Sequence, residues 1–105
     1  MADNVVPFAR PKPRMPERTR RAPLLREALG EVLREERHRQ ARTLKDVAKD
    51  AGVSTPYLSE IERGRKEPSS ECIAAVGDAL GLRLVDVVSR VERRLGGYDA
   101  VLLAA

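Results

Sequence analysis

The stretch "TLKDVAKDAGVSTPYLSEIERGRKEPSSE", residues 43–71, decides the fold. Two short runs with helical periodicity flank Gly52, which adopts the left-handed conformation of a helix exit without a Cβ penalty. Thr43 and Ser54 stand at the two positions where a side-chain oxygen caps the first turn of a helix. Pro56 is tolerated because it falls in a first turn, where no intrahelical donor is required. The stretch therefore predicts two helices joined by a tight turn.

The side chains of these two runs differ sharply between the inner and the outer face. Ala48 is small enough to allow close approach, Val53 fills the angle of the turn, and Leu58 and Ile61 bury the second helix. The outer face at the start of the second helix carries only small or polar residues, namely Thr55, Pro56, Ser59 and Glu60. A face of this kind can enter the major groove of DNA. We therefore expect a DNA-binding helix-turn-helix, since a helix pair that serves only as core would not need that face.

Further helices are expected on both sides of this pair. Apolar residues recur at i, i+3, i+4, i+7 and i+8 from Leu25 and predict a first helix over about 24–40. Ser69 can cap a fourth helix that ends at Gly81. A fifth helix is expected from about Leu84 to Leu95, with a start that frays because Arg83 is a poor cap. Nothing in the sequence predicts a strand, so the fold class is all-α with five helices.

The charge of the chain is concentrated at its N-terminus. Residues 1–23 carry six Lys or Arg against two acids, whereas residues 24–105 carry fourteen of each. Five of the seven prolines also lie in this stretch. Because proline removes backbone donors and like charges repel, we expect an extended or disordered basic arm. The arm is either a solubilising leader or a segment that follows phosphates or enters the DNA minor groove.

The composition excludes several classes of protein. The single cysteine, Cys72, excludes an internal disulfide and, with a polar start that lacks an apolar signal sequence, indicates a cytoplasmic protein. No run is long enough to cross a membrane. No Cys/His pair or Gly-rich phosphate loop has a useful spacing, so we expect neither an enzyme nor a cofactor. His38 has no second ligand nearby, so no metal site is expected. Cys72 itself is expected to be a small buried side chain, because no cation stands next to it.

These residues resemble a known family of regulators. From about Leu24 to Val88 the chain resembles the helix-turn-helix proteins of the Cro and lambda-repressor type, also called the xenobiotic-response-element (XRE) family. With "GEVLREERHRQARTLKDVAKDAG" at residues 30–52, it is most similar to the actinobacterial regulators of Clp protease genes. The resemblance implies a lambda-repressor-like fold and sequence-specific binding to double-stranded DNA. It further implies an activator of Clp protease and stress genes, with RNA polymerase as a further partner.

The resemblance also assigns roles to individual residues. In this family the start of the third helix contacts base edges. The resemblance implies the same role here for Ser54, Thr55, Pro56, Tyr57 and Glu60, and Ser59 lies on the same face. Phosphates are bound in this family by the start of the second helix and by the loop after the third. The resemblance implies this role here for Thr43, Lys45, Arg63, Arg65 and Lys66. Tyr57 has two open roles, which are a phosphate contact through its hydroxyl and cover for the base of the helix.

Two positions qualify this assignment. Many members have Gln directly after the cap of the second helix, where this chain has Leu44, so that contact would have to come from Lys45 or the Thr43 backbone. Arg37 and Glu62 match a pair that bridges the first and third helices in this family. Glu62 is therefore expected to be structural rather than a base reader, and removing one partner of such a pair could cost ~3 kcal/mol.

The fifth helix carries a broader apolar face than a four-helix body needs. The residues of that face are Leu84, Val87, Val88, Val91 and Leu95, with Val85 beside them. A second subunit would cover it, and two recognition helices ~34 Å apart would read a palindromic or pseudo-palindromic operator. We therefore expect a homodimer. A toxin could cover the same face instead, so the alternative function is the antitoxin of a toxin-antitoxin pair. A third possible function is that of a bridging protein that makes only protein contacts.

The chain ends in an apolar tail, "GGYDAVLLAA", at residues 96–105. This tail either completes the dimer interface or is detached by Gly96 and Gly97, because glycine tolerates many backbone conformations. A detached end would expose Leu103, Ala104 and Ala105, which resemble the degradation tags recognised by Clp-type proteases. The predicted organisation is therefore a basic arm over 1–23, a DNA-binding domain over 24–95 and an apolar tail over 96–105.

Overall fold

A computed structural model describes the backbone of residues 24–104 and the side chains of residues 24–96. The basic arm of residues 1–23 and Ala105 lie outside the described residues. The described chain forms five helices: α2 (Leu25–Arg39), α3 (Leu44–Ala51), α4 (Thr55–Glu62), α5 (Ser70–Ala79) and α6 (Leu84–Ala104). Within residues 24–104 there is no strand. The predicted all-α fold with five helices is confirmed.

The helix-turn-helix is formed by α3 and α4, and its ends follow the predicted caps. The Asp46 amide donates to Thr43 Oγ1 at 3.0 Å, and the Tyr57 amide donates to Ser54 Oγ at 3.1 Å. Gly52 has a φ of 74°, which is the left-handed conformation expected at the exit of α3. Local side-chain and backbone chemistry therefore sets where both helices begin and where the turn lies.

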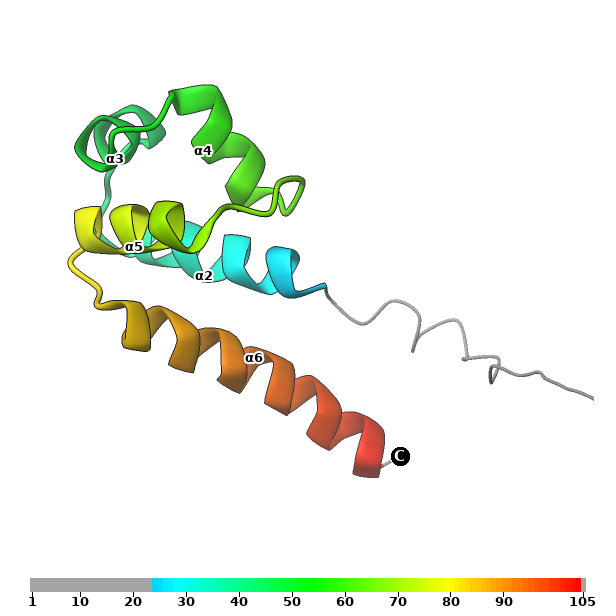
Figure 1. Ribbon diagram of the computed structural model, residues 1–105. Coiled ribbons are helices and arrows are strands. Elements are labelled where there is room, and N and C mark those ends of the chain that lie inside the picture. Colours follow the sequence, from blue (N-terminus) through cyan, green and yellow to red (C-terminus); the bar gives the residue numbers. More distant parts are fainter. Residues whose placement is uncertain (1–23, 105) are drawn as a thin grey trace, which may run out of the picture.

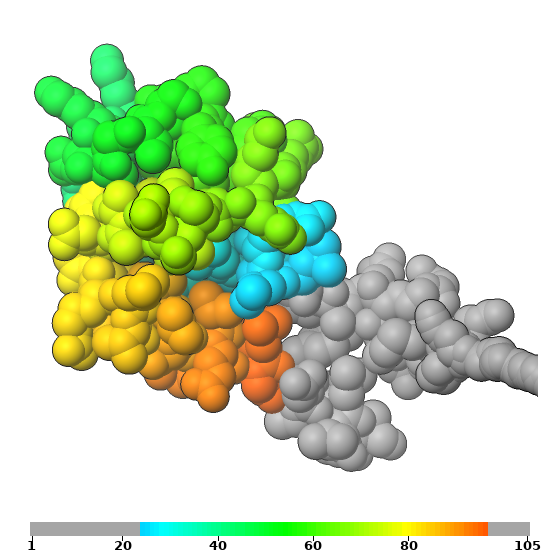
Figure 2. All heavy atoms as spheres, in the orientation of Figure 1, coloured from blue at the N-terminus to red at the C-terminus, as the bar shows by residue number. Residues whose placement is uncertain are grey.

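The helices pack in three layers. Figure 1 shows α2 and α5 in the middle, α3 and α4 on one side of them, and α6 on the opposite side. The space-filling view shows the same order, with the residues of α3 and α4 at one end and those of α6 at the other (Figure 2). The core is aliphatic and is formed by Ala28, Leu29, Val32, Leu33, Val47, Ala48, Leu58, Ile61, Val76, Leu80, Val87 and Val91. This arrangement leaves the two outer layers on opposite sides of the molecule.

α2 packs closely against the end of α4 at Gly30, a residue to which the sequence pattern assigns no role. A Cβ atom at Gly30 would lie 2.4 Å from the Ile61 carbonyl oxygen and 2.7 Å from that of Glu62. Both are backbone atoms, so no side-chain rotation could relieve the overlap. Gly30 therefore allows α2 to set the position of α4.

The predictions for α6 are wrong at both ends. Its start does not fray, because the Asp86 carboxylate accepts from the Arg83 amide at 3.0 Å and closes the first turn from within. The helix also does not stop at Leu95 but continues through Gly96 and Gly97 to Ala104. A glycine costs only about 1 kcal/mol in a helix interior, and helix formers lie on both sides of the pair. None of the described helices, α6 included, has the length and apolar character needed to span a membrane.

The apolar face of α6 is divided between the chain's own core and the solvent. Val87 and Val91, which are predicted to lie in the dimer interface, are only 1% and 6% exposed and pack mainly against the core of their own subunit. The reason is that α6 folds back onto α2, which buries residues one helical turn apart. Val88 and Leu84 remain 55% and 43% exposed, and Leu95 packs partly against the core.

Candidate nucleic-acid interface

The start of α4 lies on the outer side of the helix-turn-helix, away from α6 (Figure 1). Ser54 and Pro56 are exposed there, and Thr55 is half-buried. Ser59 and Glu60, one turn further on, are also half-buried. Because the opposite face of α4 is fixed in the core, this outer face is held rigidly and remains open to a ligand.

Tyr57 is half-buried and packs against the core near Cys72 rather than standing free on this face. The covering role considered for Tyr57 therefore agrees with its packing, and a phosphate contact through its hydroxyl stays a prediction. Cys72 is half-buried at the same place, and burial raises the pKa of its thiol. A thiol with a raised pKa carries little thiolate, which agrees with a packing role for this cysteine.

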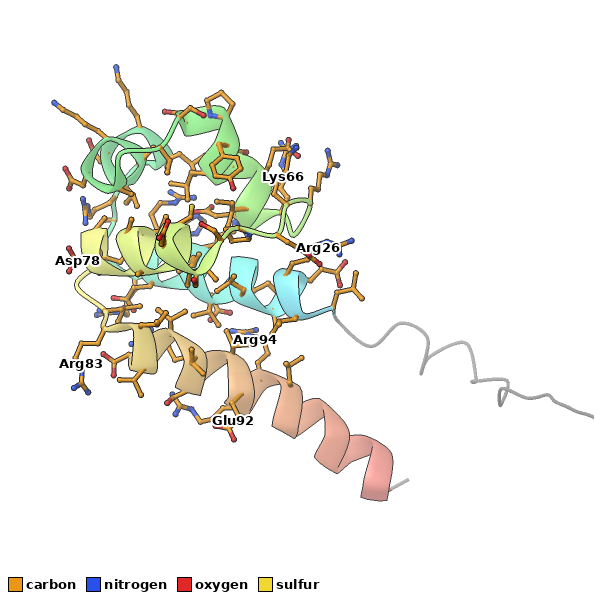
Figure 3. The ribbon with its side chains drawn as sticks, in the orientation of Figure 1. Arg26, Lys66, Asp78, Arg83, Glu92 and Arg94 are labelled. Carbon is orange, nitrogen blue, oxygen red and sulfur yellow. The ribbon has the colours of Figure 1, made fainter. Side chains whose placement is uncertain are left out.

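The predicted phosphate contacts border the same face. Thr43 and Lys45 are exposed at the start of α3, and Arg63, Arg65 and Lys66 are exposed at the end of α4 and in the following loop. Figure 3 shows Lys66 beside the end of α4. The structure thus gathers hydroxyl and cationic side chains on both flanks of the α4 face, which suits a polyanion that crosses it.

The loop that carries Arg65 and Lys66 is tied to α2. The Arg26 Nε atom donates to the Gly64 carbonyl oxygen at 2.8 Å, and the Arg26 guanidinium pairs with Glu67 at 3.2 Å. Gly64 has a φ of 75°, and a Cβ atom there would lie 2.9 Å from the Glu27 Cα. The loop therefore has a defined position relative to α4.

Leu44 occupies the position where many members of the family have Gln. Its side chain is half-buried and packs against the core. It therefore cannot supply the polar contact of a glutamine, and the neighbouring Lys45 is the exposed residue at this helix start.

The predicted pair of Arg37 and Glu62 is present. Arg37 Nε donates to Glu62 Oε2 at 2.8 Å and Arg37 Nη2 donates to Glu62 Oε1 at 2.9 Å, with side-chain exposures of only 10% and 5%. The hydrogen bonds to Glu62 raise the pKa of Arg37. Arg37 Nη1 also donates to the Arg42 carbonyl oxygen at 2.9 Å, just before α3. One guanidinium therefore joins α2 to the end of α4 and to the entry of α3.

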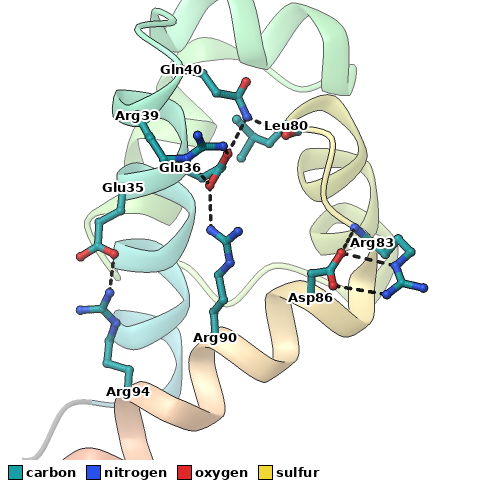
Figure 4. A network of polar contacts seen from close by, with 9 residues as sticks. All are labelled: Glu35, Glu36, Arg39, Gln40, Leu80, Arg83, Asp86, Arg90 and Arg94. Carbon is teal, nitrogen blue, oxygen red and sulfur yellow. Dashed lines mark hydrogen bonds and ion pairs between the residues drawn. The ribbon is translucent and has the colours of Figure 1, made fainter.

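A second polar centre, formed around Glu36, joins α2 to α6 (Figure 4). The Glu36 side chain is 1% exposed and accepts hydrogen bonds from Arg39, from Gln40 Nε2 at 2.8 Å and from Arg90 Nη1 at 2.7 Å. The hydrogen bond from Arg39 is the largest of the effects that lower the pKa of Glu36 to about 2. Adjacent residues of α2 therefore anchor opposite layers, with Glu36 holding α6 and Arg37 holding α4.

Comparison with known proteins identifies this arrangement. Residues 28–91 match the family described as a helix-turn-helix domain. The transcriptional regulator ClgR of Mycobacterium tuberculosis strain H37Rv is 52% identical over 83 residues, which cover 79% of this chain and 74% of the relative.

Solved structures agree with this match. The clp gene regulator ClgR from Corynebacterium glutamicum has a TM-score of 0.70 and 47% identity, covering 75% of this chain and 84% of that one. The restriction-modification controller protein C.Esp1396I, solved as a tetramer with its 35 base-pair operator, has a TM-score of 0.65 and covers 70% of this chain and 96% of that one. At 18% identity it shares the fold alone. The chain belongs to the ClgR family of helix-turn-helix transcriptional regulators, which are DNA-binding proteins and not enzymes.

Proposed function

We propose that this protein is a sequence-specific transcription regulator that binds a palindromic or pseudo-palindromic operator as a homodimer. The observation that carries the proposal is the outer face of α4, which presents Ser54, Thr55 and Pro56 together with exposed Lys45 at the start of α3 and three exposed cations directly after α4. The α4 residues would contact base edges in the major groove, and the cations would contact the phosphates on either side.

The homodimer is supported by an apolar groove on the far side of the molecule. The groove has a volume of about 290 Å³ and is lined by Leu25, Leu29, Ser70, Ile73, Leu84, Val87, Val88 and Val91. Exposed Val88 lies beside exposed Val85 on the same helix. In a two-fold dimer each subunit would place such residues in the groove of the other, because the same patch serves both partners. The groove lies opposite the α4 face, so this contact would leave both recognition helices free.

The proposed targets are Clp protease and stress genes, with activation through RNA polymerase in the cytoplasm. The support for the Clp genes is 47% identity to a protein described as the clp gene regulator ClgR. The relatives named above with high identity are transcriptional regulators, which favours this function over the antitoxin alternative. The sign of regulation is tested by transcript levels of Clp protease genes, which should fall when this gene is deleted.

Selection of bound duplexes from random DNA tests the binding proposal. We expect selected sites with two half-sites about one helical turn (~34 Å) apart. Thr55→Ala should change which sequences are selected, whereas Arg65→Ala should weaken all sites about equally. Arg93→Ala, an exposed arginine of α6, serves as the control and should bind like the wild type. Selection of single half-sites would argue against the dimer, and an unchanged preference in Thr55→Ala would argue against base contact by this residue.

A further inference from the structure

A pocket of about 230 Å³ opens between α2, α3 and α4, next to the cations described above. The pocket is lined by Arg34 and His38 of α2, Leu44 of α3, Ser59 of α4, Arg63 directly after α4, and the ion pair of Arg37 and Glu62. Arg34 and His38 were not among the residues that the sequence predicted for DNA binding. The pocket brings them within reach of the same ligand as Arg63.

The charges around this pocket are not balanced. Arg37 and Glu62 neutralise each other through two hydrogen bonds. Arg34 and Arg63 are exposed, and within residues 24–96 neither side chain makes an ion pair or a hydrogen bond. The α2–α6 side of the molecule differs, since Arg39, Arg90 and Arg94 all pair with carboxylates there. The pocket therefore keeps two positive charges for an external anion.

His38 adds a hydrogen-bond donor to the pocket. Its Nε2 atom lies 3.2 Å from Arg37 Nη2. Because an arginine nitrogen can only donate, Nε2 would accept in this contact, which leaves Nδ1 as the ring atom that can donate. An imidazole N–H beside two arginines suits a phosphate oxygen.

We infer that this pocket binds a phosphate group of the DNA backbone and that Arg34 and His38 are positioning contacts for it. The inference rests on the proposed function and deepens it by adding α2 to the DNA-binding surface. Leu44 and Arg63 place the pocket between the start of α3 and the end of α4, which are the two flanks predicted to hold phosphates. A backbone that contacts both flanks passes this pocket. Such a contact carries no sequence information but fixes the orientation of α4 in the groove.

Salt-dependent binding to a selected operator tests the inference. Arg34→Ala should reduce the slope of log K against log salt by about 2 for a dimer, since each lost phosphate contact changes it by about 0.9. His38→Ala should weaken binding with a smaller change of slope than Arg34→Ala, because it removes a hydrogen bond rather than an arginine charge. Arg93→Ala removes another exposed arginine, from α6, and should change neither quantity. Circular dichroism establishes that each variant is folded.

Single methylphosphonate substitutions in the same duplex locate the contact, because each removes one phosphate charge. At one position per half-site, the substitution should lower the operator affinity of the wild-type protein by roughly the same factor as Arg34→Ala does. The same substitution should not lower the affinity of Arg34→Ala any further. The inference would be overturned, and the proposed function left standing, by either of two results. One is that Arg34→Ala binds the operator like Arg93→Ala. The other is that Arg34→Ala remains as sensitive as the wild type to methylphosphonate at every position. A wild-type protein that binds no duplex would overturn the proposed function and this inference with it.

Discussion

Replacing Gly30 by alanine should destabilise the protein, although the same change usually stabilises a helix. Alanine is favoured over glycine in a helix interior by about 1 kcal/mol. At Gly30, however, the added methyl group would lie 2.4 Å from the Ile61 carbonyl oxygen and 2.7 Å from that of Glu62. Overpacking typically costs ~1–3 kcal/mol, and contact with backbone atoms belongs at the upper end because no rotamer change relieves it. Subtracting the gain in helix propensity from the cost of overpacking leaves a net loss of about 2 kcal/mol in the free energy of unfolding.

Urea and thermal unfolding, followed by circular dichroism, measure this loss. For a domain of this size 1 kcal/mol corresponds to roughly 4–8 °C in Tm, so we expect Gly30→Ala to melt about 8–16 °C lower. All proteins should be compared at one concentration, because dimerisation makes Tm depend on it. Gly96→Ala is the matched control, since Gly96 lies in α6 and a Cβ atom there meets nothing within 4 Å. It should gain up to about 1 kcal/mol.

The two glycine variants also make a prediction for DNA binding. α4 must move away from α2 in Gly30→Ala to accommodate the methyl group, so its operator affinity should fall even at temperatures where the variant is folded. Gly96→Ala should bind like the wild type. Equal stability gains in both variants would refute the close approach of α2 and α4 at Gly30.

Two further predictions concern the other side of the molecule. The pKa of Glu36 is lowered from 4.5 to about 2, so its charged form should add about 3 kcal/mol to the free energy of unfolding above pH 4.5. This contribution should be lost as the pH falls toward 2. Stability curves of the wild type and Glu36→Gln should therefore converge on acidification, and parallel curves would contradict this role. Changing Ala104 and Ala105 to Asp should lengthen the cellular half-life without altering dimerisation if the end of the chain is a degradation signal. Loss of the dimer would instead assign this segment to the interface.

Local sequence patterns are enough to predict where the helix-turn-helix begins, turns and ends. Thr43 and Ser54 accept hydrogen bonds from amides three residues away, and Gly52 takes the left-handed conformation at the turn. These interactions act within a few residues of each other, so short patterns are enough to predict them. The Arg37 and Glu62 pair was also predicted, but through a family resemblance, because the two residues are 25 positions apart.

Which side chains pack in the core and which remain exposed depends on how the helices dock against one another. Val87 and Val88 are neighbours in one apolar run, yet one is 1% exposed and the other 55%, because α6 docks on α2 at a particular rotation. Gly30 and Glu36 acquired their roles in the same way, since neither a carbonyl of α4 nor an arginine of α6 is visible in the pattern of α2. Burial and close approach depend on how helices far apart in sequence meet, and local periodicity sets only the face that each helix offers.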